Sequence, residues 1–155
     1  MGVIEMLIET TRFGQLEFRD HEVYTFPHGI PGFENYKSFT LIDVEDSPFY
    51  YLQSIEEGSL AFVAVDPFSF YPDYEFNLPE QTEQELAISV IEDVRVLNIV
   101  SIQGSLEKAT INLVAPVILN AAARKGVQII LEGTGYTTRH GLQAPVTTAG
   151  TEGEA

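Results

Sequence analysis

Apolar and polar residues alternate over several short stretches of the chain, a pattern typical of β-strands with one buried face. After a turn at residues 12–15, for example, residues 16–19 (LEFR) alternate strictly. Residues 60–65 are apolar throughout, which indicates a strand buried on both faces. The other strands predicted on this basis cover residues 23–26, 39–44, 49–55, 94–102, 109–114, 117–119 and 127–131.

Turns and short helical stretches separate the predicted strands. Residues 27–33 (PHGIPGF) contain two prolines and two glycines, so their backbone is restricted and favours a turn. A short helix is predicted at residues 78–86, where Pro79 suits the first turn and three glutamates favour the positive end of the helix dipole. Alanines at residues 121–123 favour one helical turn, which Gly126 would end.

These elements predict a mainly β protein with a small antiparallel β-barrel-like fold, of about eight to ten short strands and one or two short helical turns. A chain of 155 residues is long enough for one domain with a real core. We assign residues 1–141 to this single β domain. Residues 142–155 contain no aromatic side chain and are predicted to form a disordered tail.

Residues 65–76 (VDPFSFYPDYEF) break the alternating pattern, and we call them the aromatic–acidic segment. They combine five aromatic side chains with three carboxylates and two prolines. Pro67 and Pro72 lack a backbone N–H and push the residues before them toward extended conformations, so we expect no helix to run through the segment. We predict a stiff, irregular connection between strands, with some rings in the core and others exposed among negative charges.

The chain is strongly acidic, with 8 Lys and Arg against 23 Asp and Glu and a net charge of −15. The excess lies in residues 34–93, where fourteen carboxylates and the single cation Lys37 give a local net charge of −13. Residues 94–141 carry five cations and two carboxylates, a net charge of +3. Such acidity repels phosphates, which argues against direct nucleic-acid binding and favours a basic partner, although a simple contribution to solubility explains it equally well.

Residue types suited to catalysis or metal binding are sparse. No cysteine occurs, which excludes disulfides, thiolate metal sites and cysteine catalysis. His21, His28 and His140 lack partners at the spacing of helical metal ligands, and no nucleophile motif is present. We therefore predict a protein that is not an enzyme and uses no cofactor or metal. Two other classes stay open: a carbohydrate- or small-ligand-binding barrel with aromatic and carboxylate side chains in one pocket, and a structural subunit of a larger assembly.

The beginning of the chain does not have the pattern of a signal peptide, because no basic region precedes its apolar run, which contains Glu5 and Glu9. No stretch of the sequence reaches the roughly 18 uncharged apolar residues that a membrane span needs. We expect a soluble cytoplasmic protein with no membrane partner.

Three groups of short motifs occur in order along the chain: GIPGF at residues 29–33 with Phe39 downstream; LQS at 52–54, VDPF at 65–68 and DYE at 73–75; NLVAP at 112–116, Asn120 and RKGVQ at 124–128. Each motif is weak alone, but their order and spacing are specific. Together they resemble the flagellar assembly factor FliW family of bacteria, and the resemblance covers roughly residues 10–140.

This resemblance implies a barrel-like protein that binds other proteins. Proteins of this family bind CsrA, a dimeric RNA-binding translational repressor, by a non-competitive mode and relieve its repression of flagellin translation. They also bind flagellin near its C-terminal helical region. Flagellin that accumulates in the cytoplasm would occupy the protein, free CsrA and stop flagellin synthesis. The implied function is a partner-exchange switch that couples flagellin translation to flagellum assembly.

We predict that the aromatic–acidic segment binds these partners. Its carboxylates would attract a basic protein, and its rings would offer an apolar surface to a helix. For each ring, burial in the core is the competing interpretation. Residues 29–33 are assigned to architecture, since their prolines and glycines define a backbone path. The predicted partner-binding residues are Asp66, Phe68, Phe70, Tyr71, Asp73, Tyr74 and Glu75.

Overall fold

The computed structural model describes residues 5–19 and 22–142, and over these residues the chain is mainly β. The predicted tail at residues 142–155 lies outside this range except for Leu142. In chain order the strands are β1 (Glu5–Thr10), β2 (Gly14–Arg19), β3 (Val23–Thr25), β4 (Ser38–Asp43), β5 (Phe49–Ser54), β6 (Ala61–Val65), β7 (Val94–Gln103), β8 (Ser105–Ile111), β9 (Val117–Asn120), β10 (Lys125–Gln128) and β11 (His140–Gly141). The helical elements are the 3-10 turns η2 (Pro67–Ser69) and η3 (Ile91–Asp93) and the helix α1 (Glu80–Glu85).

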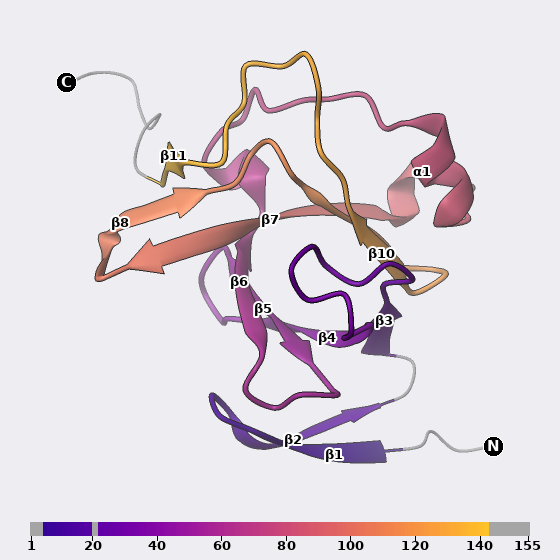
Figure 1. Cartoon of the computed structure of the whole chain (residues 1–155), viewed down its shortest axis with the longest axis vertical. Helices are drawn as coiled ribbons and strands as arrows, with labels where there is room; N and C mark the ends of the chain where they lie inside the picture. Colours follow the sequence, from indigo (N-terminus) through magenta and orange to yellow (C-terminus); the bar gives the residue numbers. More distant parts are fainter. Residues whose placement is uncertain (1–4, 20–21, 143–155) are drawn as a thin grey trace.

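Seven of these strands close into a barrel, which confirms the predicted fold class (Figure 1). The order around the barrel is β7, β6, β5, β4, β3, β10 and β9, and β9 pairs with β7 again. All the pairings are antiparallel except that of β3 with β10, where Lys125 lies opposite Thr25 in parallel. Closure leaves this part of the sheet without a free edge, the usual way in which small β proteins avoid unpaired strands.

The longest strand, β7, belongs to the barrel and to an extension beyond it. Residues 94–97 pair with β9, whereas Val100 and Ser101 pair with β8. A register shift follows between Ser101 and Gln103. β8 in turn pairs with the short strand β11. The β7–β8 hairpin therefore projects from the barrel, as Figure 1 shows.

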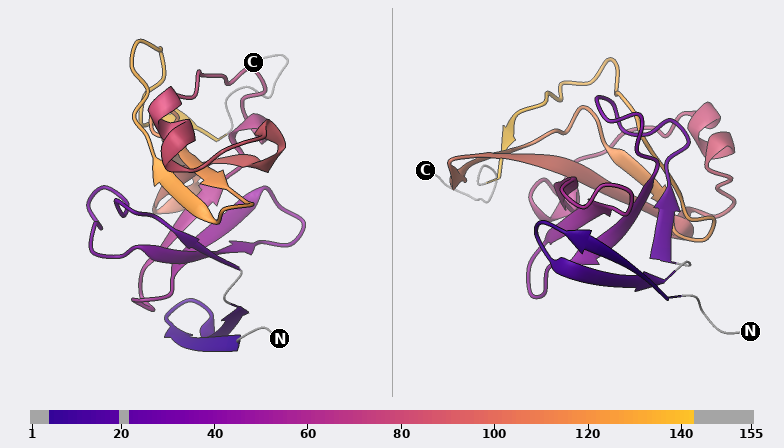
Figure 2. Two further views of the ribbon diagram at one scale, coloured as in Figure 1. Left: turned by 90° about the vertical axis from the view of Figure 1, so that its right-hand side faces the viewer. Right: turned by 60° about the horizontal axis from the view of Figure 1, so that its bottom comes forward.

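The β1–β2 hairpin forms a separate two-stranded sheet beneath the barrel (Figure 2). The backbone N–H of Thr11 donates to the carbonyl of Gly58 at 3.1 Å, and the ring of Phe13 lies edge-on to Tyr51 at 5.2 Å. The hairpin thus rests on the turn between β5 and β6. The sequence had predicted only its second strand.

Two hydrophobic clusters hold the fold together. The first fills the barrel, and the second lies beneath the aromatic–acidic segment and the β7–β8 extension. The buried members of the first are Tyr24, Phe26, Ile30, Phe39, Leu52, Ala64, Leu97, Val117 and Leu119. The buried members of the second are Val65, Tyr74, Val100, Ala109, Ile111, Leu113, Leu131 and Leu142.

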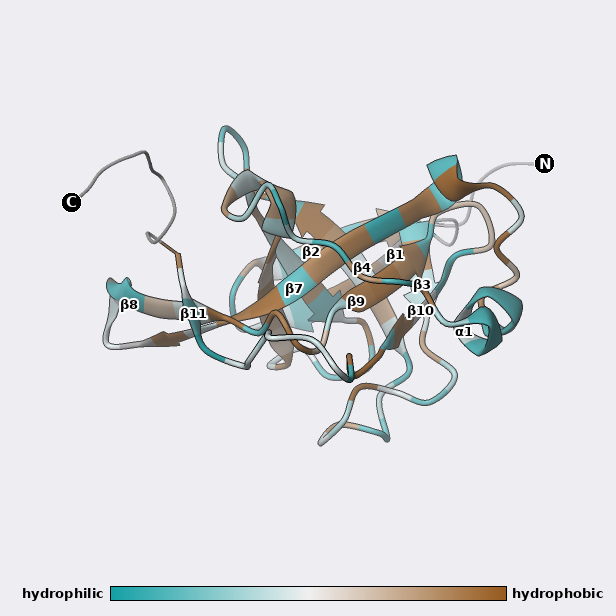
Figure 3. Cartoon of the chain, turned by 90° about the horizontal axis from the view of Figure 1, so that it is seen from above, coloured by the Kyte–Doolittle hydropathy of each residue, from teal (hydrophilic) through white to brown (hydrophobic). Residues whose placement is uncertain are grey.

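The predicted helix at residues 78–86 is confirmed in a shorter form as α1, which is hydrophilic along most of its length (Figure 3). The residue that follows it, Leu86, is 1% exposed and anchors it. The buried Nδ2 of Asn120 donates to the carbonyl of Leu86 at 2.7 Å and so ties α1 to the end of β9. No helix in the described part of the chain is long and apolar enough to cross a membrane.

The one helical turn predicted at residues 121–123 lies between β9 and β10, where the backbone N–H of Arg124 donates to the carbonyl of Asn120 at 2.8 Å. Asn120 lies opposite Lys125 in the hairpin, and Arg124 has a left-handed backbone with φ of 58°. The Arg124 guanidinium lies over the Tyr24 ring, 3.9 Å from its centroid. Pairing of β9 with β10 limits the helical conformation to this single turn, and the cation–π contact adds to its stability.

The glycine motif of residues 29–33 has the architectural role assigned to it. Gly29 has φ of 67°, and a Cβ there would lie 2.6 Å from the Cα of Glu34, so the position requires glycine. The next residue, Ile30, is 1% exposed and enters the barrel core.

We predict that Gly126→Ala destabilises the barrel. A Cβ at this position would lie 2.6 Å from Cζ of Phe26 and 2.8 Å from Cδ2 of Leu119, both fully buried. Overpacking of this kind lowers the free energy of unfolding by about 1–3 kcal/mol, measurable by urea unfolding. Gly135→Ala is the matched control, because nothing lies within 4 Å of its Cβ position. Equal stability of the two variants would contradict the prediction.

Candidate functional site

The aromatic–acidic segment leaves β6 and forms two successive turns. The Asp66 carboxylate accepts a hydrogen bond from the backbone N–H of Phe68 at 3.0 Å and caps η2, which begins at Pro67. The N–H of Tyr74 then donates to the carbonyl of Tyr71 at 2.9 Å. We expected no helix here; one 3-10 turn forms because a proline is tolerated at the first position of a helical turn.

Tyr74 anchors the segment in the second hydrophobic cluster, with 3% of its side chain exposed. Its hydroxyl donates to the carbonyl of Leu113 at 2.7 Å and accepts from Nδ2 of Asn98 at 3.3 Å. The same Nδ2 donates to the carbonyl of Asn112 at 2.8 Å. Burial raises the pKa of Tyr74 to about 12, so the hydroxyl is protonated and able to donate at neutral pH. Of the predicted binding residues, Tyr74 therefore supports the surface from within.

Phe70 and Tyr71 are half-buried over the same cluster. Phe70 packs against Phe49, with ring centroids 6.4 Å apart. The Tyr71 hydroxyl donates to the carbonyl of Gly141, and its ring lies edge-on to His140 at 5.7 Å. Burial raises the pKa of Tyr71 above its ordinary value. These two rings fasten the segment to β5 and β11 while keeping part of their surface in solvent.

The most exposed ring of the segment is Phe68, with 43% of its surface accessible. One side of it lies against Tyr74, with ring centroids 5.8 Å apart. Asp73 and Glu75 are also exposed, and within residues 5–19 and 22–142 neither carboxylate takes part in an ion pair. The segment thus presents one apolar ring together with two unpaired negative charges.

A groove with a volume of about 860 Å³ borders the end of the segment. One wall consists of residues 75–77 with Pro79 and Gln81, and the other of residues 130–134. Ile130 on the second wall is 63% exposed, which is unusual for a large apolar side chain. The sequence analysis missed this wall. Its only signal was the apolar run at residues 129–131, which was assigned to the last strand, although β10 ends at residue 128.

The groove does not have the composition expected for a carbohydrate-binding pocket. It contains one aromatic ring, Phe76, with the carboxylates of Glu75 and Glu132, whereas the other rings of the segment pack inward or lie outside it. The interior of the barrel is filled by the first hydrophobic cluster. The arrangement favours an open protein-docking surface over an enclosed ligand site.

The histidines lie apart from this surface or in structural contacts. Nε2 of His28 lies 3.0 Å from Oε2 of Glu85, so His28 joins the turn at residues 27–33 to α1. His140 accepts from the backbone N–H of Thr137 at 2.9 Å. His21 lies outside the described residues. Within the described part of the chain, no three His, Asp or Glu side chains are grouped closely enough to hold a metal ion.

The fold and this surface define the chain as a small β-barrel protein with an acidic, partly aromatic exposed surface. The family model described as "FliW protein" matches residues 7–142. The chain belongs to the FliW family, as its motifs predicted. This is a family of flagellar assembly factors and not of enzymes, so the prediction of a non-enzymatic protein is also confirmed.

Similar proteins match over nearly their full length. The flagellar assembly factor FliW of Caldicellulosiruptor saccharolyticus is 42% identical over 142 residues, which cover 92% of this chain and 93% of that protein. The FliW of Bacillus subtilis is 41% identical over 136 residues, covering 87% and 95% respectively. A crystal structure of the flagellar assembly factor FliW superposes with a TM-score of 0.83 at 37% identity, covering 92% of this chain and 100% of that one.

We predict that Tyr74→Phe lowers the free energy of unfolding by about 1–3 kcal/mol, because it leaves the buried Asn98 amide and the Leu113 carbonyl short of a partner. Urea unfolding monitored by circular dichroism measures the loss. Tyr136→Phe is the matched control, since the Tyr136 hydroxyl accepts an exposed N–H from Glu75 at 3.2 Å and has no buried partner among the described residues. A Tyr74→Phe variant as stable as this control would refute the anchoring role.

Proposed function

We propose that this protein acts in flagellum assembly as a cytoplasmic regulator that binds CsrA and flagellin in exchange. By binding CsrA it relieves translational repression of flagellin, and by binding flagellin it gives up CsrA again. The observation that carries the proposal, beside membership of the FliW family, is the surface where exposed Phe68 accompanies the unpaired carboxylates of Asp73 and Glu75. An apolar contact and a negative field are the two features that these partners would require.

Charge supports the first partner. A protein that grips RNA presents lysines and arginines, so it is attracted to a chain with a net charge of −15. Because Asp73 and Glu75 pair with no cation among the described residues, they are available to pair with an incoming basic surface. Once bound, the acidic protein would repel phosphates beside the RNA path. By this route the acidic protein would antagonise RNA binding without covering the RNA site of CsrA. Such a mode is non-competitive.

Apolar surface supports the second partner. An amphipathic helix that docks in a groove needs exposed apolar residues along its path. Phe68 and the exposed parts of Phe70 and Tyr71 form one such surface, and Ile130 on the groove wall adds another. The C-terminal helical region of flagellin is the proposed occupant. Because both partners would use parts of the aromatic–acidic segment, binding of one would exclude the other.

We predict that the double variant Asp73→Lys, Glu75→Lys weakens CsrA binding more than tenfold, equivalent to about 1.4 kcal/mol, when titrated by calorimetry. Reversing both charges replaces attraction of a basic surface by repulsion. Asp66 is left unchanged, since it caps η2 and its loss would disturb the backbone. The control is Glu17→Lys, Glu92→Lys, which changes the net charge equally on β2 and η3.

A measurement of RNA displacement across salt concentrations tests the electrostatic mechanism. The screening length falls from about 10 Å at 0.1 M salt to about 3 Å at 1 M, so RNA displacement at equal occupancy of CsrA should decrease as salt increases. If displacement is unchanged by salt, repulsion is not the mechanism. If the two double variants bind CsrA equally, Asp73 and Glu75 are not part of the contact surface.

We predict that Phe68→Ala weakens binding of flagellin at least tenfold and leaves CsrA binding less affected, because the substitution removes apolar area without changing charge. Pull-down of each partner alone and of both together measures this and also tests exchange. Leu7→Ala is the control, an exposed apolar residue on β1 with 62% of its surface accessible. A stable ternary complex of all three proteins would exclude the exchange mechanism.

A further inference from the structure

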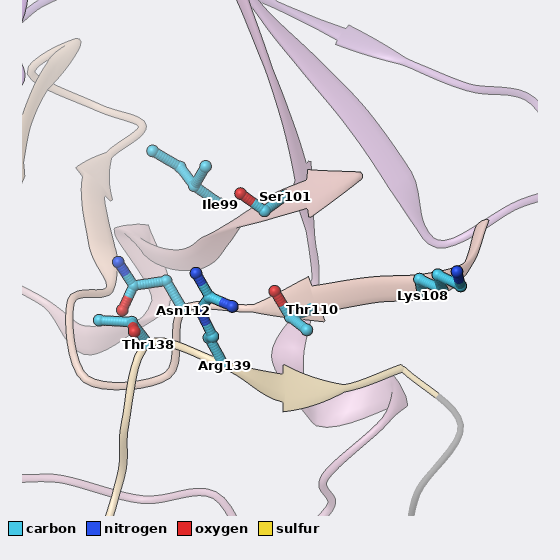
Figure 4. Close-up of a pocket in the computed structure, with 7 residues that line it drawn as sticks. All are labelled: Ile99, Ser101, Lys108, Thr110, Asn112, Thr138 and Arg139. Carbon is cyan, nitrogen blue, oxygen red and sulfur yellow. The ribbon is translucent and has the colours of Figure 1, made fainter. Parts of the chain in front are cut away.

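A polar pocket of about 260 Å³ lies away from the acidic groove, where the chain before β11 crosses the β7–β8 extension (Figure 4). The lining residues come from three segments that are distant in sequence. β7 contributes Ile99 and Ser101, and residues 138–139 precede β11. From β8 and the residue after it come Lys108, Thr110 and Asn112, which share one face because strand side chains alternate.

The charge of this pocket is opposite in sign to the net charge of the protein. Its lining contains two cations, Lys108 and Arg139, and no carboxylate. The groove beside the aromatic–acidic segment contains Glu75 and Glu132, and a third pocket beside β4 contains three carboxylates. The pocket also lies in the part of the sequence, residues 94–141, that has a net charge of +3 in a chain of −15. The proposed binding of a basic partner depends on the negative charges and gives no role to this positive region.

The cations in the pocket have no negative partner in the part of the chain that the structure describes. Over residues 5–19 and 22–142, neither Lys108 nor Arg139 forms an ion pair. The Asn112 side chain is oriented by its Oδ1, which accepts from the backbone N–H of Ala115 at 3.1 Å. Its Nδ2 is therefore available as a donor. The hydroxyls of Ser101, Thr110 and Thr138 are further hydrogen-bond donors in the lining. The lining contains no carboxylate that would compete with an anionic ligand for these donors.

The backbone that carries Arg139 is held in place. The carbonyl of Thr137 accepts from the N–H groups of Leu113 at 3.1 Å and of Val114 at 3.2 Å. The N–H of Thr137 donates to Nε2 of His140 at 2.9 Å, and that of Arg139 donates to Oγ1 of Thr137 at 3.3 Å. The crossing chain is thus fastened to the end of β8. In Figure 4 the Arg139 side chain lies between Asn112 and Thr110.

We propose that this pocket binds the oxyanion group, phosphate or carboxylate, of a small ligand. Guanidinium and ammonium groups with nearby hydroxyl and amide donors are the chemistry that recognises such groups. Ile99 is the one large apolar side chain in the lining, so the pocket offers no surface on which a nucleobase could stack. The inference does not depend on the proposed function, because neither Asp73 nor Glu75 contributes to the pocket.

The test is a titration of the isotope-labelled full chain with orthophosphate and, separately, with acetate, followed by two-dimensional NMR at constant ionic strength maintained with chloride. We expect saturable shifts at the amides of Ser101, Thr110 and Asn112. Arg139→Gln should weaken the apparent affinity at least about tenfold, as expected for the loss of one charge-assisted hydrogen bond. Saturation by phosphate at lower concentration than acetate assigns a phosphate ligand, and the reverse order assigns a carboxylate.

Lys125→Gln is the matched control, a cation on β10 from the same positive part of the sequence that does not line the pocket. Retention of the remaining NMR signals shows that each variant is folded. Shifts that grow linearly without saturation for both anions would overturn the inference. So would saturable shifts that Arg139→Gln leaves unchanged, or that Lys125→Gln weakens equally. Because no partner protein is present, the outcome is separate from that of the CsrA and flagellin experiments.

Discussion

The buried hydroxyl of Tyr74 is the contact on which the proposed docking surface depends. It joins the aromatic–acidic segment to the carbonyl of Leu113 and to Asn98 on β7, three parts of the chain that are distant in sequence. A buried polar group left without a partner costs about 1–3 kcal/mol, so these bonds strongly favour one position of the segment. The entropy of ordering a proline-rich connection is lost during folding, and a partner then meets a surface that is already formed.

The strand β7 places the two candidate sites on opposite sides of one element. Asn98 and Val100 face the cluster beneath the aromatic–acidic segment, whereas Ile99 and Ser101 line the cationic pocket. Alternation along a strand explains how adjacent residues serve surfaces of opposite charge. The same strand closes the barrel through residues 94–97. Because β7 is long enough to extend beyond the barrel, it contributes residues to both sites.

Local patterns predicted most of the strands, although not β1 or β11, because alternation and turn residues report on each element separately. They could not predict closure of the barrel through the parallel pairing at Thr25 and Lys125, which depends on contacts a hundred residues apart. The same limit applied to the site. The composition of the aromatic–acidic segment marked it as unusual, but only packing shows that Tyr74 is buried and Phe68 exposed. The wall at residues 130–134 was missed because an apolar run is the same in sequence whether it pairs as a strand or leaves the sheet.

The acidity of the chain combines two physical roles that composition could not separate. Several carboxylates accept hydrogen bonds from backbone N–H groups in turns, and for Glu34 the bond from Gly32 holds the pKa below its usual range. The carboxylates with such bonds are Glu22, Glu34, Glu56, Glu57 and Asp66. Under the proposed function they would add to the long-range field that attracts a basic protein, but hydrogen bonds to the backbone hold them in place. Asp73 and Glu75 have no side-chain bond of this kind among the described residues, so they are free to reorient toward a partner. Under the proposed function, the whole acidic chain would attract a basic partner at a distance, and Asp73 and Glu75 would make the contact with it.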